Sequence, residues 1–208
     1  MIKTLLFDLG GVLLNLDKEA CIQSFINLGY KDVRSMITNY RQEGMLRLLE
    51  SGLVTPDEFC DGIRKLVGKE VEDEVIKEAV RSFLLDIPMY KLEYLAELKK
   101  NYRIVMLSNT SSIAIEYIYR RNLTNRGLKL ENYFDECYYS FELKSMKPDD
   151  ECFERMIEQS SLAPKDTLFL DDSMANLEAS KKFGFQTFYA KEYTDWREEL
   201  NQFLTQNR

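Results

Sequence analysis

The sequence predicts an α/β protein, a Rossmann-like doubly wound parallel sheet with an inserted all-helical cap. Five short apolar runs have the length of buried strands. From residue 86 onward, helical patterns separate these runs, and such alternation is typical of a parallel sheet with right-handed crossovers. Between the first two runs lies a segment of about ninety residues without a strand signal, which is too long for a loop.

The expected strands are continuous apolar runs, as in a sheet that is covered on both faces. They span residues 2–7, 103–107, 136–140, 167–170 and 186–190. The first run ends at Asp8 and a Gly-Gly pair, which indicates a strand that leads into a tight turn. Helical patterns lie over residues 90–100, 112–121, 149–159 and 175–183.

The strand-free segment is expected to be a helical cap over one end of the sheet. Thr55-Pro56-Asp57-Glu58 is a capping box with proline in the first helical position, and it opens a helix that extends to about residue 67. Helical patterns also span residues 18–28, 40–49 and 73–84. We therefore expect residues 1–15 and 86–208 to form the core domain and residues 16–85 the cap domain.

The 208-residue chain contains no histidine, and this absence excludes whole classes of chemistry. Serine–histidine and cysteine–histidine nucleophiles, histidine-ligated metals and histidine proton shuttles cannot operate here. The 35 acidic and 28 basic residues give a net charge of −7, which argues against a nucleic-acid partner. Any chemistry must therefore use carboxylates, lysine, hydroxyls, backbone amides or a metal held by oxygen.

The cysteines and the amino-terminal residues predict the compartment. The four cysteines include no Cys-x-x-Cys pair, which favours reduced thiols in a cytoplasmic protein over a zinc or redox site. Residues 1–14 are apolar, but they carry Asp8, lack a small-residue cleavage site and are too short to span a bilayer. We therefore expect a cytoplasmic protein with no membrane partner.

Polar side chains gather at the carboxyl ends of the expected strands, where parallel sheets build their sites. Carboxylates that meet there repel each other unless a cation lies among them, and hard oxygen ligands suit Mg²⁺. A magnesium ion, a lysine, a hydroxyl and helix-start amides together make a phosphate site, in which a carboxylate can act as nucleophile. The residues concerned are Asp8, Ser108, Asn109, Lys147, Asp171 and Asp172.

Four segments resemble, in order, the four motifs of the haloacid dehalogenase-like (HAD) hydrolase superfamily. They are Phe7-Asp8-Leu9-Gly10-Gly11-Val12, Leu107-Ser108-Asn109-Thr110, Lys147-Pro148 and Phe169-Leu170-Asp171-Asp172. Each motif alone is a weak signal, but four in order are a strong one. The resemblance spans residues 2 to about 190 and includes the cap between the first two motifs. Among family members, the chain is similar to the small bacterial sugar-phosphate phosphatases and to the amino-terminal phosphatase domain of soluble epoxide hydrolases.

The resemblance implies the catalytic and phosphate-binding residues. Asp8 would attack phosphorus and become an aspartyl phosphate. Lys147 would neutralise the charge that Asp8 and the phosphate bring together. Ser108 and the Asn109 amide would hold the phosphoryl oxygens beside Lys147.

The resemblance also implies a magnesium site. Asp8, the backbone carbonyl of Gly10 and Asp172 would bind Mg²⁺. Asp171 would contribute through water or would orient Lys147. Asn176 matches a family position near the metal loop, although a polar residue in the first turn of a helix is an equally good explanation.

The chain departs from the family pattern at Gly10. Family phosphatases usually carry a second aspartate two residues after the nucleophile, which acts as general acid and then as general base. General acid–base help is typically worth about 100- to 10,000-fold, or roughly 3 to 5 kcal/mol. We therefore expect slow turnover, with the proton carried by a substrate hydroxyl, a cap residue or water.

Some candidates also have a purely structural explanation. Ser108 has the residue type of a helix N-cap, and Asp17 and the Asp149-Asp150 pair are better explained as capping or loop residues. Three further residues lie on an expected cap helix that could face either the crevice or the solvent, namely Tyr40, Arg41 and Arg47.

The favoured function is that of a Mg²⁺-dependent phosphatase that hydrolyses a small phosphorylated metabolite such as a sugar phosphate. One alternative is a catalytically impaired phosphate-binding or regulatory protein, which Gly10 favours. A less favoured alternative is a 2-haloacid dehalogenase, an enzyme that needs no metal and would leave the Asp171-Asp172 pair unexplained. The sequence predicts neither the substrate nor the oligomeric state.

Overall fold

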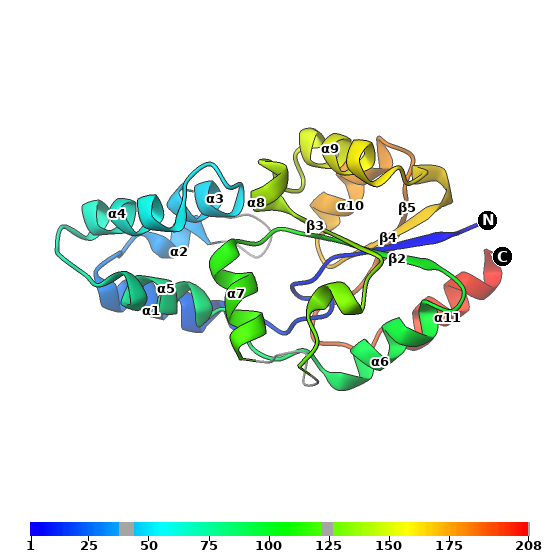
Figure 1. Ribbon diagram of the computed structural model, residues 1–208, viewed down its shortest axis with the longest axis horizontal. Helices are drawn as coiled ribbons and strands as arrows, with labels where there is room; N and C mark the ends of the chain where they lie inside the picture. Colours follow the sequence, from blue (N-terminus) through cyan, green and yellow to red (C-terminus); the bar gives the residue numbers. More distant parts are fainter. Residues whose placement is uncertain (38–43, 122–126, 208) are drawn as a thin grey trace.

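Five parallel strands form the central sheet of the computed structural model, which describes residues 1–37, 44–121 and 127–207 (Figure 1). The strand order is β3-β2-β1-β4-β5, so β1 lies in the centre. All four pairings are parallel, as predicted. The strands are β1 (Thr4–Phe7), β2 (Arg103–Ser108), β3 (Glu136–Tyr139), β4 (Thr167–Asp171) and β5 (Gln186–Tyr189).

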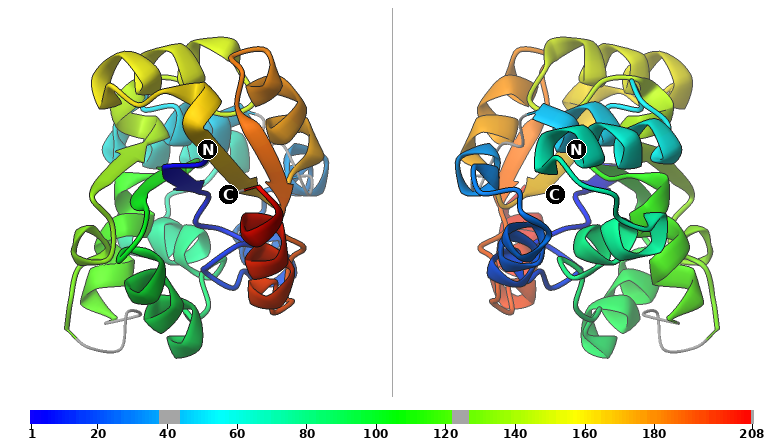
Figure 2. Two further views of the ribbon diagram at one scale, coloured as in Figure 1. Left: turned by 90° about the vertical axis from the view of Figure 1, so that its right-hand side faces the viewer. Right: turned by 90° about the vertical axis from the view of Figure 1, so that its left-hand side faces the viewer.

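Helices cover both faces of the sheet because successive side chains of a strand point to opposite faces. Leu5 and Phe7 pack in one cluster with α6 (Met89–Leu98), α7 (Ser112–Arg120) and α11 (Arg197–Gln206). Leu6 packs on the opposite face with α9 (Asp150–Ser160) and α10 (Met174–Lys181). Figures 1 and 2 show the sheet between these helical layers. The predicted doubly wound core is confirmed.

A second group of helices lies beyond the carboxyl ends of the strands, and both chain ends lie at the opposite end of the molecule (Figures 1 and 2). These helices bury a hydrophobic cluster of their own, in which Phe25, Phe59 and Ile76 have no exposed surface. This packing supports the proposal that residues 16–85 form a cap on a core of residues 1–15 and 86–208. The helices are α1 (Lys18–Leu28), α2 (Val33–Met36), α3 (Gly44–Glu50), α4 (Pro56–Val67) and α5 (Asp73–Arg81).

Two helix starts in this group follow their sequence signals. The Glu58 N–H donates to Thr55 Oγ1 at 3.2 Å and the Thr55 N–H donates to Glu58 Oε2 at 2.8 Å, which completes the predicted capping box of α4. Asp17 caps α1, where its Oδ1 accepts a hydrogen bond from the Ala20 N–H at 2.9 Å. Both caps satisfy N–H groups that the first turn of a helix leaves unpaired.

The structure contains helices for which the sequence has little signal. α2 and α8 (Ser140–Leu143) have four residues each, too few to show a helical period. The sequence of α11 is largely polar, and this helix buries only Leu200 and Leu204. Two short 3₁₀ helices, η1 (Leu130–Asn132) and η2 (Pro164–Asp166), complete the described elements.

Two of the expected helix starts involve residues 40–43 and Ser108. Residues 40–43 of the helix predicted over residues 40–49 lie outside the described residues, and α3 begins at Gly44. Ser111 is the N-cap of α7, where its Oγ accepts a hydrogen bond from the Ala114 N–H at 3.3 Å. The structural alternative for Ser108 is therefore wrong, since β2 ends at Ser108 and the helix starts three residues later.

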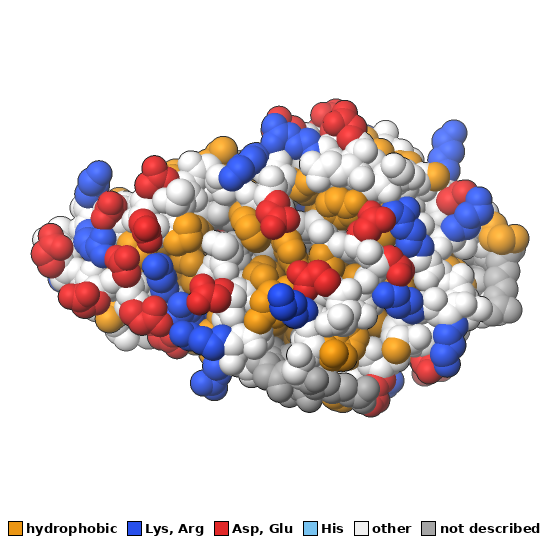
Figure 3. All heavy atoms as spheres, in the orientation of Figure 1, with side chains coloured by type: hydrophobic (Ala, Val, Ile, Leu, Met, Phe, Trp, Pro, Cys, Tyr) orange, Lys and Arg blue, Asp and Glu red, His pale blue; other side chains and the backbone are white. Residues whose placement is uncertain are grey.

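No helix within the described ranges is both long enough and apolar enough to cross a bilayer. On the face shown in Figure 3, acidic and basic side chains are interspersed, and acidic ones gather over the cap helices at the left.

Candidate active site

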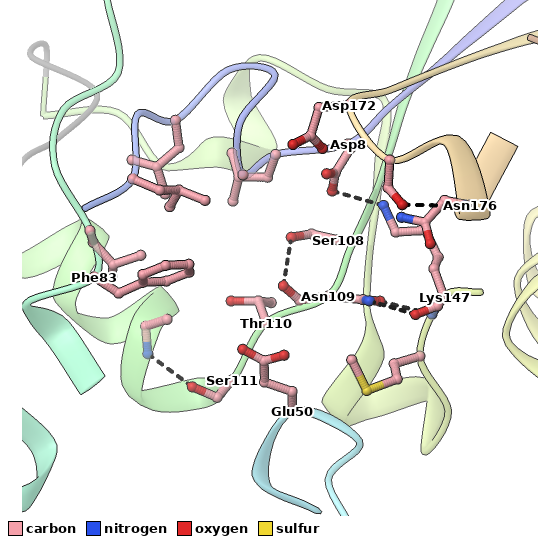
Figure 4. A pocket seen from close by; sticks show the side chains of 18 of the residues that line it. Asp8, Glu50, Phe83, Ser108, Asn109, Thr110, Ser111, Lys147, Asp172 and Asn176 are labelled. Carbon is pink, nitrogen blue, oxygen red and sulfur yellow. Dashed lines mark hydrogen bonds and ion pairs between the residues drawn. The ribbon is translucent and has the colours of Figure 1, made fainter. Parts of the chain in front are cut away.

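A pocket lies between the carboxyl ends of the strands and the cap helices (Figure 4). Its volume of about 140 Å³ suits a small metabolite, since pockets for drug-sized ligands measure roughly 300–1,000 Å³. The cap contributes Glu50, Val80 and Phe83 to its wall. The predicted site residues that line it are Asp8, Gly10, Ser108, Asn109, Lys147, Asp172 and Asn176.

Lys147 is the buried cation of the site. Its side chain is 1% exposed, and its Nζ lies 2.8 Å from Asp8 Oδ1 and 2.7 Å from Asp171 Oδ2. Burial alone would lower the pKa of Lys147, but the charges of Asp171 and Asp8 raise it above its usual value. The lysine is therefore protonated, and a single ammonium group joins the ends of β1 and β4.

Asp171 lies behind the pocket wall, where it holds Lys147 in place. Its Oδ1 accepts a hydrogen bond from the Ser173 N–H at 2.8 Å, and Asn176 Nδ2 donates to both of its oxygens, at 3.0 and 3.1 Å. Together with the bond from Lys147, these contacts use both oxygens of a carboxylate that has no exposed surface. Of the two roles the resemblance implies for Asp171, the geometry favours orienting Lys147.

Three carboxylates gather at one end of the pocket. One oxygen from each of Asp8, Asp171 and Asp172 lies within 4.8 Å of the other two. Burial raises the pKa of the Asp8 carboxyl to about 6, although Lys147 opposes the rise. Burial and the charges of Asp8 and Asp171 raise the pKa of Asp172 to about 9, and a hydrogen bond with Glu192 adds to the effect. These shifts show a cluster of negative charge that a divalent cation would offset.

Glycine at position 11 allows this cluster to form. Gly11 has φ = +75°, and a Cβ atom there would lie 2.4 Å from Asp172 Oδ2. Any other side chain would therefore displace the Asp172 carboxylate and strain the backbone. Asn176, on α10, completes this end of the site. Its Oδ1 is buried and accepts no hydrogen bond from the residues that the structure describes.

The loop after β2 supplies the next wall of the pocket. Ser108 is 2% exposed, and Figure 4 shows its hydroxyl between Asp8 and Asn109. The Asn109 side chain is engaged with the backbone of Lys147: its Nδ2 donates to the Lys147 carbonyl at 2.8 Å, and its Oδ1 accepts from the Lys147 N–H at 2.9 Å. Only the backbone N–H of Asn109 is then suited to hold a phosphoryl oxygen.

Gly10 leaves the site without a carboxylate two residues after Asp8. A Cβ atom on Gly10 would lie 3.1 Å from Leu16 Cδ1, so the side chain of Leu16 fills the space where a larger residue would begin. Leu16 belongs to the same pocket wall. An aspartate at position 10, where family phosphatases usually carry one, would therefore require the Leu16 side chain to shift.

The structure brings residues into the pocket that sequence reasoning did not find. Glu50 and Phe83 come from the cap, and Thr110 follows Asn109 in the loop after β2. The sequence carries no signal for the two cap residues, because their direction depends on how the cap sits on the core. Thr110 directly follows the Ser-Asn pair and could have been included on that ground.

The cap residues proposed from sequence do not reach the pocket where the structure describes them. Arg47 forms an ion pair with Asp149, outside the pocket wall. Asp150 pairs with Lys182, so the aspartate pair is structural, as expected. Tyr40 and Arg41 lie outside the described residues.

The fold and the site define an α/β enzyme with an acidic cluster at the carboxyl ends of a parallel sheet. Residues 2–184 match the model of the haloacid dehalogenase-like hydrolase family. The chain belongs to this family, and it is a hydrolase.

Relatives with known names and structures extend over nearly the whole chain. The chain is 36% identical over 204 residues to a D-ribitol-5-phosphate phosphatase of Bacteroides thetaiotaomicron, covering 98% of this chain and 99% of the relative. It is similar to a HAD family enzyme of the same organism, solved in complex with magnesium and inorganic phosphate (40% identity, 96% and 99% covered, TM-score 0.86). A HAD-like family hydrolase from Porphyromonas gingivalis has a TM-score of 0.91 at 31% identity, with 98% of both chains covered.

Proposed function

We propose that this chain is a Mg²⁺-dependent phosphomonoesterase for a small phosphorylated carbohydrate or polyol. D-Ribitol 5-phosphate is the first candidate, because a relative at 36% identity is a phosphatase of that compound. The observation that carries the proposal is the position of Lys147, 2.8 Å from Asp8 in a pocket of small volume that Asp172 also lines. This arrangement supports a phosphoryl group held next to a carboxylate nucleophile.

The donor set fits magnesium. Asp8, the backbone carbonyl of Gly10 and Asp172 would hold the ion, since hard oxygen ligands suit it. When bound, Mg²⁺ would offset the carboxylate charges and polarise the phosphoryl group. The structure with magnesium and inorganic phosphate is that of a relative at 40% identity, which supports the same ion here.

The chain's own residues divide the reaction between them. Ionised Asp8 attacks phosphorus in line with the ester oxygen, and a bond from the carboxylate to phosphorus forms as the ester bond breaks. Lys147, the Ser108 hydroxyl and the Asn109 N–H hold the phosphoryl oxygens and their developing charge. The alcohol leaves with the electron pair and takes up a proton. Water then attacks the aspartyl phosphate, which releases inorganic phosphate and restores Asp8.

Gly10 provides no proton donor for the leaving alcohol and no base for the water. A substrate hydroxyl or a water molecule would carry these protons, so turnover should be slow by the standard of general acid–base catalysis. The same feature favours the alternative function, that of a phosphate-binding protein with impaired turnover. Leu16 packed against Gly10 is the observation in its favour.

A panel of phosphorylated metabolites, assayed with Mg²⁺ and with a chelator, tests the proposal. Mg²⁺-dependent release of inorganic phosphate, highest for polyol and sugar phosphates, is the expected result. Magnesium-dependent binding of these compounds without release would support the alternative. Chloride release from a 2-haloacid in the presence of chelator would favour a dehalogenase and overturn the proposal.

A further inference from the structure

One acidic residue of the pocket belongs to the cap and has no part in the chemistry above. Glu50, the last residue of α3, lines the pocket. Figure 4 shows its carboxylate beside Thr110 and Ser111, with Ser108 and Asn109 between it and Asp8. The pocket therefore has acidic groups at both ends. The aspartates of the core lie at one end, and Glu50 of the cap lies at the other.

The main chain at Glu50 is fastened to the core, which fixes the point from which its side chain extends. The Glu50 carbonyl accepts a hydrogen bond from Ser140 Oγ at 2.6 Å, and Ser140 has no exposed surface. The same hydroxyl oxygen accepts a bond from the Thr110 N–H at 2.9 Å. One serine thus links the cap to the loop that carries the phosphate-binding residues.

The next turn of the chain reinforces this attachment. Gly52 has φ = +62°, and a Cβ atom there would lie 2.0 Å from the carbonyl oxygen of Phe141. Lys144 Nζ donates to the Gly52 carbonyl at 2.8 Å. The contacts on both sides of Ser51 fix the position from which the Glu50 side chain enters the pocket.

Charge decides which part of a substrate can meet Glu50. The phosphoryl group belongs at the opposite end, next to Lys147, which is the cation at 2.8 Å from Asp8. A carboxylate only accepts hydrogen bonds, so it attracts hydroxyl groups and repels a second anion. Apolar side chains of Leu16, Val80 and Phe83 line the same pocket, and their low polarity strengthens both effects.

We propose that Glu50 determines substrate specificity by accepting hydrogen bonds from hydroxyl groups of the leaving alcohol at the end remote from the phosphate. This inference rests on the proposed phosphatase function, which it refines. Glu50 selects a substrate whose leaving alcohol is hydroxylated and uncharged, such as a polyol. It rejects a leaving alcohol of the same length that ends in a carboxylate or a second phosphate.

Three substrates separate these effects. D-Ribitol 5-phosphate and D-ribonate 5-phosphate have the same length and differ at the remote end, which is a hydroxyl in one and a carboxylate in the other. p-Nitrophenyl phosphate has the phosphoryl group but no hydroxyl. The variants are Glu50→Gln, which keeps the shape, and Glu50→Ala, while Glu70→Gln on the exposed part of the cap is the control for loss of one negative charge.

Each ratio of kcat/KM has an expected change. Glu50→Ala should lower the ratio for D-ribitol 5-phosphate over p-nitrophenyl phosphate by about 10- to 100-fold, the worth of a hydrogen bond to a charged group. Glu50→Gln should reduce the preference for D-ribitol 5-phosphate over D-ribonate 5-phosphate by at least about tenfold, because the repulsion between carboxylates is lost. Glu70→Gln should leave both ratios unchanged.

Equal losses with all three substrates would overturn the assignment, because they would mean that Glu50 only supports the fold. Unchanged ratios with active enzyme would overturn it too, while leaving the phosphatase proposal intact.

If the wild-type chain shows no turnover, the proposed function fails, and the same comparison is made by calorimetric binding with Mg²⁺ present. Weaker binding of D-ribitol 5-phosphate to Glu50→Ala, with inorganic phosphate bound equally by both proteins, would then still support Glu50 as the hydroxyl acceptor. Equal binding of both ligands would overturn it.

Discussion

Lys147 Nζ lies 2.8 Å from Asp8 Oδ1, and the two side chains are only 1% and 11% exposed. Asp171 also pairs with Lys147, and one oxygen of Asp172 lies within 4.8 Å of oxygens of Asp8 and Asp171, so the cluster holds three carboxylates and one ammonium group. With all of them ionised, the cluster carries two net negative charges, which one divalent cation would neutralise. This balance of charge supports the proposed magnesium site beside the buried lysine.

Loss of the lysine should affect both activity and stability. Lys147→Met should lower kcat/KM by about 100- to 1,000-fold, because a positive group at the phosphoryl oxygens is removed. The variant should also lose about 3–5 kcal/mol of unfolding free energy at neutral pH, since Asp171 would remain buried without its partner. Phosphatase assays and urea unfolding measure the two effects.

Lys182→Met is the matched control for this variant. Lys182 pairs with Asp150 at 2.8 Å, but its side chain is 62% exposed, so the pair should contribute less than about 1 kcal/mol. Similar losses in the two variants would contradict a special role for Lys147.

The metal-free protein should become less stable as the pH rises. In the fold the pKa of Asp172 is raised to about 9, above the usual value, so the folded chain binds a proton that the unfolded chain releases. The stabilisation that this bound proton gives to the fold is complete below about pH 4 and is lost as the pH rises toward 9. With chelator present, the melting temperature should therefore fall between pH 6 and pH 9, and added Mg²⁺ should raise it more at the higher pH.

The Asp172→Asn variant tests whether Asp172 causes this dependence of the melting temperature on pH. The amide does not titrate, so the variant should melt with a weaker dependence on pH and respond less to Mg²⁺. Differential scanning fluorimetry over this pH range makes the comparison. Identical slopes in the two proteins would show that Asp172 does not hold the proton.

The absence of a carboxylate at Gly10 should appear in the response to the leaving group. Without a proton donor, kcat/KM should fall steeply as the pKa of the leaving alcohol rises across a series of aryl and alkyl phosphates. Gly10→Asp combined with Leu16→Ala, which removes the side chain 3.1 Å from the new Cβ, should flatten this dependence. A flat dependence in the wild-type chain would reveal another proton donor in the site.

The attachment of the cap should be sensitive to a single methyl group. Gly52→Ala should lower kcat/KM, because its Cβ would collide with the Phe141 carbonyl and push the cap from the core. Gly68→Ala is the control, since Gly68 has a similar φ of +69° but no atom within 4 Å of the new Cβ. Both variants should lose about 1 kcal/mol or more of stability from backbone strain, and only Gly52→Ala should lose activity. Equal activity in the two would show that cap position does not matter.

The sequence predicted the sheet and the acidic end of the site because both depend on local patterns. The apolar run before Asp8 and the run before Asp171 end abruptly at polar residues, and parallel strands bring such ends together. The capping box at Thr55 is likewise a local signal, and the structure contains it.

The rest of the site depends on contacts between distant residues. The Asn109 side chain binds the backbone of Lys147, 38 residues away, and this pairing leaves no pattern in the sequence. The main chain at Glu50 is held at the pocket by contacts that include a hydrogen bond from Ser140, 90 residues further along the chain. Tertiary packing of this kind sets which side chains of a helix face a site, and helical periodicity alone does not.

Hydrolysis of p-nitrophenyl phosphate by the wild-type chain and by Asp8→Asn, each with Mg²⁺ and with chelator, tests the central claim most directly. Asparagine keeps the size of the side chain but removes the carboxylate nucleophile. The predicted result is turnover by the wild-type chain with Mg²⁺ and none above background in the other three cases. Turnover by Asp8→Asn at the wild-type rate, or by the wild-type chain in chelator, would contradict it.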